Sequence, residues 1–106
     1  MKTLGIETEA IGADAWVLKL TGTLDSDTRA ALTAKLDSLL QQQGLASISV
    51  DMSKVEYMAS AGAGAILKAM LSAKDKGVRL TFLNLHPRVQ YIFRVMGLPM
   101  DSSQMT

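Results

Sequence analysis

Alternation of apolar and polar residues with a period of two constrains the fold of this chain more than any other feature. It occurs in the segments AWVLKLT (15–21), SISVDM (47–52) and RLTF (79–82). A β-strand with this pattern has one apolar face and one polar face. Each segment is therefore predicted to be a strand that is covered on one side only.

Three other segments carry apolar residues with a helical period. The first is predicted to be capped by Asp25 or Ser26 and to stop at Gly44, the second to span 60–77 and the third to span 87–97. The residues expected to face the core are Leu32, Leu36, Leu39 and Leu40 in the first helix, Ala63, Ile66, Leu67, Met70 and Leu71 in the second, and Val89, Ile92, Phe93 and Met96 in the third.

The order of these elements predicts an α/β fold with a mixed sheet of four to five strands. A weaker alternating segment, TLGIETE (3–9), precedes IGADA (11–15), which is predicted to join it to the next strand as a hairpin. Helices separate the later strands, which implies right-handed crossovers and parallel neighbours. Because each strand has a single apolar face, all helices are expected on the same side of the sheet.

Length and composition favour one small cytoplasmic domain. The chain has 106 residues, predicted to form a single domain over 1–106 with a loosely held tail from about residue 100. The formal net charge is +1, there is no cysteine, and no cluster of Lys and Arg suggests a nucleic-acid partner. The first residues turn acidic too early for a signal peptide, and no apolar run is long enough to enter a membrane.

Residues for catalysis, metal binding or nucleotide binding do not occur in a pattern typical of these functions. The single histidine, His86, precedes Pro87 and is predicted to be a helix cap or a turn residue. The carboxylates lack metal-ligand spacing, and there is no phosphate-binding glycine loop followed by lysine. We therefore expect no enzymatic activity, no metal and no cofactor.

The segment YMASAGAGAIL (57–67) leaves two interpretations open. Ser60 is predicted to be the N-cap of the second helix, but the positive end of a helix also suits a regulatory phosphate on this hydroxyl. The small side chains at 61–64 allow a close approach either by the protein's own sheet or by a partner. Two methionines, Met58 and Met100, are expected near the surface, where they repack easily against partners.

Four short motifs occur in a fixed order along the chain: GTLD (22–25), DMS (51–53), ASAGAG (59–64) and GL (97–98). Together they resemble the STAS domain family, and within it the bacterial anti-sigma factor antagonists. The matching positions are Gly22, Leu24, Asp25, Asp51, Ser53, Ser60, Gly62, Gly64, Gly97 and Leu98. Three positions depart from the family pattern: Ala59 replaces the usual aspartate, Ala61 a frequent Ser or Thr, and Ala63 the usual leucine.

This resemblance implies a non-catalytic module that binds an anti-sigma factor kinase and thereby releases a sigma factor. The serine at the position of Ser60 is phosphorylated in such proteins, and phosphorylation breaks the complex. The chain is expected to be a monomer or a weak dimer without direct membrane insertion. The docking face implied by the resemblance comprises Thr23, Leu24, Asp25, Met58, Ala59, Ser60, Ala61, Gly62, Ala63 and Gly64.

Other functions stay open for a chain with this resemblance. Ala59 favours a cytoplasmic STAS subunit of a lipid-transport ABC system, which binds its transporter constitutively and need not be a kinase substrate. A structural module of a larger signalling assembly and a sensor of a small ligand are further alternatives.

Overall fold

The computed structural model describes residues 3–102, which form one four-stranded sheet and three helices. The strands lie in the order β1-β2-β3-β4, with β1 antiparallel to β2 and the other neighbours parallel. The elements are β1 (Leu4–Ile11), β2 (Ala15–Leu24), α1 (Arg29–Leu40), β3 (Ser47–Met58), α2 (Ser60–Asp75), β4 (Arg79–Leu83) and α3 (Pro87–Val95). The predicted mixed sheet and the hairpin between its first two strands are confirmed.

The three period-two segments form β2, β3 and β4, and their apolar residues face the core. Within these segments, the fully or almost fully buried side chains are Leu18 and Leu20 on β2, Ile48, Val50 and Met52 on β3, and Leu80 and Phe82 on β4. Trp16 is half-buried, and its indole N–H donates a hydrogen bond to Oε1 of Gln42 at 3.1 Å. Alternation therefore predicted correctly which face of the sheet is covered.

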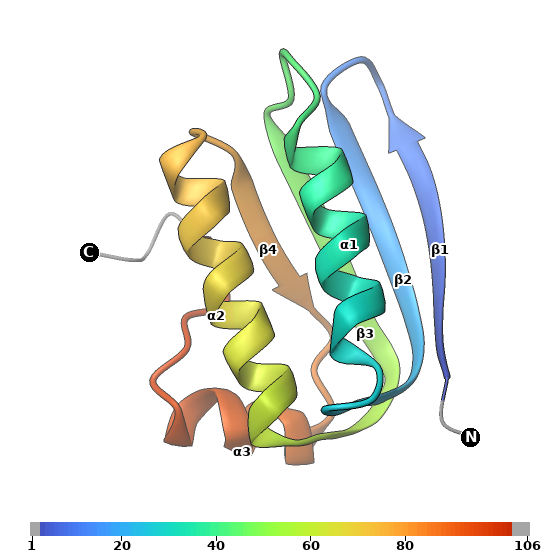
Figure 1. Ribbon diagram of the computed structural model, residues 1–106, viewed down its shortest axis with the longest axis vertical. Helices are drawn as coiled ribbons and strands as arrows, with labels where there is room; N and C mark the ends of the chain where they lie inside the picture. Colours follow the sequence, from blue (N-terminus) through green and yellow to red (C-terminus); the bar gives the residue numbers. More distant parts are fainter. Residues whose placement is uncertain (1–2, 103–106) are drawn as a thin grey trace.

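All three helices contribute to this core, as expected for strands with one apolar face. Figure 1 shows α1 and α2 side by side across the sheet, with α3 near the beginning of α2. The ring of Phe93 on α3 meets that of Phe82 on β4 edge-to-face, with centroids 5.8 Å apart. Val89 of α3 is also buried, so this short helix closes one end of the core.

The N-cap of the first helix lies two to three residues later than predicted. Asp25 does not cap α1 but folds the chain into a turn, with its Oδ1 accepting from the backbone N–H groups of Asp27 at 2.9 Å and Thr28 at 3.2 Å. Thr28 is the N-cap residue, and the helix ends at Leu40, before Gly44. A side chain that bonds the backbone two residues ahead stabilises a turn in place of a helix.

The second helix buries three of the five residues predicted to face the core, Ala63, Ile66 and Met70, but not Leu67 and Leu71. Its buried residues are Gly62, Ala63, Ile66, Ala69, Met70 and Ala73, whereas Leu67 and Leu71 are exposed to 37% and 49%. Small side chains let α2 approach the sheet closely, which turns the two leucines outward. Two methionine predictions were also wrong, because Met58 is buried and Met96 is exposed, while Met100 is exposed as expected.

Both ends of α3 follow from their sequence. The Nδ1 atom of His86 accepts a hydrogen bond from the backbone N–H of Arg88 at 3.2 Å, so the predicted histidine cap is confirmed. At the other end Gly97 has a φ of 69°, and the N–H of Leu98 donates to the carbonyl of Phe93 at 2.7 Å. This pair of features is a Schellman stop, in which glycine supplies the left-handed residue.

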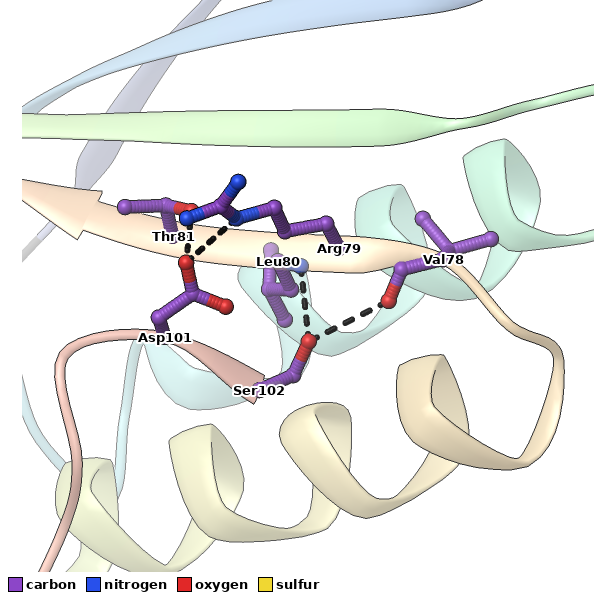
Figure 2. A network of polar contacts seen from close by, with 6 residues as sticks. All are labelled: Val78, Arg79, Leu80, Thr81, Asp101 and Ser102. Atoms are coloured by element: carbon purple, nitrogen blue, oxygen red, sulfur yellow. Dashed lines mark hydrogen bonds and ion pairs between the residues drawn. The ribbon is translucent and has the colours of Figure 1, made fainter. Parts of the chain in front are cut away.

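The chain after α3 returns along the free edge of β4 (Figure 2). Nε of Arg79 contacts Oδ2 of Asp101 at 2.6 Å, and Oγ of Ser102 accepts from the N–H of Leu80 at 2.8 Å and donates to the carbonyl of Val78 at 3.1 Å. The loose tail expected from about residue 100 is therefore wrong for Asp101 and Ser102, which are buried. The rest of that prediction, over 103–106, lies outside the described residues.

Candidate docking surface

The two segments that were predicted to form one docking face do meet in space. The end of β2 pairs in parallel with the end of β3, which places Thr23 opposite Tyr57 and Leu24 opposite Met58. The N–H of Ala59 then donates to the carbonyl of Leu24 at 2.9 Å. The β2–α1 loop and the start of α2 therefore lie side by side at one end of the sheet.

Part of this predicted face is packed inside the protein. Leu24 and Met58 are buried, and Gly62 rests directly on Leu24. A Cβ atom at Gly62 would lie 2.7 Å from the carbonyl oxygen of Leu24 and 2.8 Å from its Cγ. Since real Cβ contacts are not this short, only glycine fits there without a shift of the backbone, and the close-packing interpretation is confirmed for Gly62.

The loop that begins at Thr23 is held by its own hydrogen bonds. The hydroxyl of Thr28 donates to the carbonyl of Thr23 at 2.7 Å and accepts from the N–H of Asp25 at 3.0 Å. Asp25 and Thr28 are both buried, so their side chains shape the loop from within. Of the predicted loop residues, only Thr23 keeps a partly accessible position.

The second motif, at Asp51 and Ser53, ties β3 to the loop that precedes α3. Oδ1 of Asp51 accepts from the backbone N–H of Ser53 at 2.9 Å and from the side-chain amide of Asn84 at 3.2 Å. The hydrogen bond from Ser53 is the main reason why the pKa of Asp51 lies below its ordinary value of 3.8. Asn84 has a left-handed φ of 58°, which an asparagine tolerates and which this bond helps to hold.

Ser60 lies exposed at the first position of α2, one residue after the N-cap. Ala59 occupies the N-cap with extended backbone angles, φ −87° and ψ 167°, and no side-chain hydrogen bond caps the helix there. The prediction of Ser60 as N-cap is therefore wrong, because the chain leaves β3 in an extended conformation that continues through Ala59. Ser60 is exposed at the positive end of the helix and provides no capping hydrogen bond.

Four residues of α2 continue this exposed surface along one side of the helix, and we call them the α2 stripe: Ser60, Gly64, Leu67 and Leu71. Their spacing of four, three and four places them on one helical face. A Cβ atom at Gly64 would meet nothing within 4 Å, so this glycine is not required by packing. Leu67 and Leu71 were assigned to the core from the sequence; the competing run of alanines was the signal that would have placed them outside.

Beside the α2 stripe, α1 and α2 border a groove of about 560 Å³. Small residues form much of its lining, while Lys68, Arg29 and Asp37 bring charges to it. The predicted docking residues thus separate into a buried group at Leu24, Asp25, Met58, Gly62 and Ala63, and an accessible group led by Ser60 and Gly64, with Thr23, Ala59 and Ala61 half-buried.

Within residues 3–102, no three His, Cys, Asp or Glu side chains come close enough together to hold a metal ion. In the same range, every helix is too short or too polar to cross a bilayer.

Comparisons with known proteins agree with this architecture. A family model described as "Mlab, STAS domain" matches residues 8–100. The anti-sigma factor antagonist SpoIIAA, solved in its unphosphorylated form, is 26% identical over 89% of this chain and 82% of its own, with a TM-score of 0.77. The Bacillus SpoIIAA structure in the phosphorylated form is 24% identical over 89% and 85% of the two chains, with a TM-score of 0.72.

A protein with a different role shares the same fold. The anion transporter Slc26a9 of mouse is 13% identical over 90% of this chain but only 18% of its own, with a TM-score of 0.71. At this identity the likeness concerns the fold alone. Since the family model covers most of the sequence, the chain belongs to the STAS domain family.

Proposed function

We propose that this protein is an anti-sigma factor antagonist, a non-catalytic module that binds an anti-sigma factor kinase and so releases a sigma factor. The observation that carries the proposal is the accessible Ser60 at the start of α2, which begins an exposed stripe that includes Gly64, Leu67 and Leu71. The 26% identity with SpoIIAA supports the same function.

Phosphorylation of Ser60 would act on the partner and leave the fold intact. A phosphate adds a charge of about −1.5 to −2, and the N-terminus of α2 carries the positive end of the helix dipole. Because Ser60 is exposed and makes no capping bond, the group enters without displacing a structural contact. In the complex, the phosphate would lie where Ser60 and Gly64 offer the partner only small side chains. Its charge and bulk therefore oppose binding.

The kinase reaction tests this proposal directly. The full chain is incubated with ATP and the candidate anti-sigma factor kinase from the same genome, and intact mass is measured. We expect the mass of one phosphate on the unmodified chain and on Ser53→Ala, a matched exposed serine on β3, but none on Ser60→Ala. Absence of phosphate, or equal incorporation in Ser60→Ala, would contradict phosphorylation at this site.

A second candidate function is that of a cytoplasmic STAS subunit in a lipid-transport ABC system. Ala59 favours it, since a constitutive subunit does not need the aspartate that usually precedes the phosphorylated serine. Part of the anion transporter Slc26a9 also has this fold. Binding of transporter subunits that is unchanged by Ser60→Asp would support this function over the sigma-factor function.

A further inference from the structure

A second groove lies between the end of β3 and α3, and the side chains of this chain leave it open. It has a volume of about 410 Å³ and is apolar almost throughout. Its lining residues, which define the α3 groove, are Tyr57, Met58, Pro87, Arg88, Tyr91 and Ile92. Tyr57 is 51% exposed and Tyr91 is 59% exposed, so both rings offer a face to a ligand.

Two of the exposed large apolar side chains, Tyr57 and Tyr91, line this groove. Nine large apolar residues are exposed among residues 3–102, and six of them belong to the groove, to α3 or to the segments that lead into and out of α3. These six are Tyr57, Leu83, Tyr91, Val95, Met96 and Met100. Isolated apolar residues on a surface are ordinary, whereas two exposed aromatic rings that line one open groove are typical of a binding surface.

Within the segment 84–100 that contains α3, all charged residues are positive. Residues 84–100 contain Arg88 and Arg94 but no Asp or Glu, and Arg88 is the charged residue that lines the groove. A guanidinium pairs best with a carboxylate, because its fork of N–H donors matches the two oxygens. The groove is therefore complementary to an apolar group that lies next to a negative charge.

The residue types favour a protein over a lipid surface as the source of that group. Tyr, Met and Arg are enriched in the centres of protein–protein interfaces, where Lys, Asp and Glu are depleted, and residues 84–100 also lack lysine. Adsorption to an anionic membrane depends on clustered cations, and two arginines on a helix of nine residues supply little attraction.

We propose that the α3 groove binds a segment of a partner protein that places a bulky apolar side chain between Tyr57 and Tyr91 and a carboxylate at Arg88. The groove shares no lining residue with the α2 stripe, although Met58 also belongs to the docking face that the resemblance implies. Binding there does not require the modification of Ser60, so the inference stands independently of the proposed switch.

The test uses a phage-displayed library of random peptides selected on the immobilised full chain. We expect the enriched peptides to carry Phe, Trp or Leu next to Asp or Glu. In a ¹H–¹⁵N titration they should shift the resonances of Tyr57, Arg88 and Tyr91. Tyr91→Ala should weaken binding about tenfold or more without lowering the melting temperature, because exposed aromatic anchors dominate interface affinity but add little to the fold.

Two further variants separate recognition from general damage. Arg88→Glu should weaken binding, and a peptide whose acidic residue is exchanged for lysine should restore it. Leu71→Ala, an exposed apolar residue on the α2 stripe, is the matched control and should leave the affinity unchanged.

Three results would overturn the proposal. One is a selection in which no enriched peptide shifts the resonances of the groove residues. Another is peptide binding that is indifferent to Tyr91→Ala, or not restored in Arg88→Glu by the lysine peptide. The third is binding to phosphatidylcholine vesicles containing phosphatidylglycerol that is lost in Tyr91→Ala, which would assign the groove to a lipid surface.

Discussion

The inner and outer sides of the first turns of α2 both consist of small residues, but they serve different purposes. On the inner side, Gly62 and Ala63 are buried, and Gly62 leaves no room for a Cβ atom against Leu24. On the outer side, Gly64 would accept a side chain without any contact, and Ser60 is exposed. Two glycines separated by one residue therefore have different reasons to be glycine: one belongs to the fold and the other to an open surface.

The largest effect on stability is expected on the inner side. Gly62→Ala forces the new methyl group against the carbonyl of Leu24, and overpacking of this kind costs about 1–3 kcal/mol in the free energy of unfolding. Urea unfolding monitored by circular dichroism measures this change. An unchanged unfolding midpoint would show that α2 can shift away from β2, and the comparison of the two sides would fail.

Adding the missing N-cap side chain of α2 is expected to give the next largest change in stability. Ala59→Asp restores an N-cap side chain at a residue whose backbone angles already suit it, and should stabilise the protein by about 0.5–2 kcal/mol. For a domain of this size, each kcal/mol corresponds to roughly 4–8 °C in melting temperature. Ala59→Asn is the uncharged control and should retain most of the gain; no rise in either variant would contradict the assignment of Ala59 as N-cap.

The outer glycine should respond with the opposite sign to the inner one. Gly64→Ala meets no atom within 4 Å and replaces a poor helix former, so the free energy of unfolding should rise by about 0.5–1 kcal/mol. Measured beside Gly62→Ala by the same denaturant titration, the two alanines give opposite shifts of the midpoint. A loss of stability in both variants would mean that both glycines are needed for packing.

The smallest effect concerns Asp51, a motif residue whose role is to hold a loop. Its pKa is lowered mainly by the hydrogen bond from the N–H of Ser53, so its charge stabilises the folded state above the ordinary pKa of 3.8. Asp51→Asn should melt slightly below the unmodified chain at pH 7. The difference should shrink as the pH falls below 3.8 and vanish once the folded-state carboxylate is protonated, as thermal melts across pH can show.

Local patterns were enough to predict most of the fold. Alternation over 15–21, 47–52 and 79–82 gave the correct strands and their buried face, since a period of two determines which side each residue takes. His86 and Gly97 marked the ends of α3 correctly, because a cap and a left-handed glycine act within one turn of the chain.

The errors arose where distant contacts decide the outcome. Hydrophobicity alone favoured Leu67 and Leu71 as core residues, but the closeness of α2 to the sheet selects its alanine face. The hydrogen bonds of Asp101 and Ser102 to β4 join residues that are 22 positions apart in the chain. No local sequence pattern predicts them. The α3 groove likewise combines Tyr57 with Tyr91, whose proximity only the structure reveals.

The docking face itself stays a prediction, and the affinity for an anti-sigma factor kinase tests it most directly. Isothermal titration calorimetry would compare the unmodified chain, Ser60→Asp and Ser53→Asp. We predict equal affinities for the unmodified chain and Ser53→Asp. For Ser60→Asp we predict an affinity at least about tenfold lower, a loss of about 1.4 kcal/mol in binding free energy. Equal affinities for all three proteins would contradict the account, because a charge at the start of the α2 stripe would then not touch the interface.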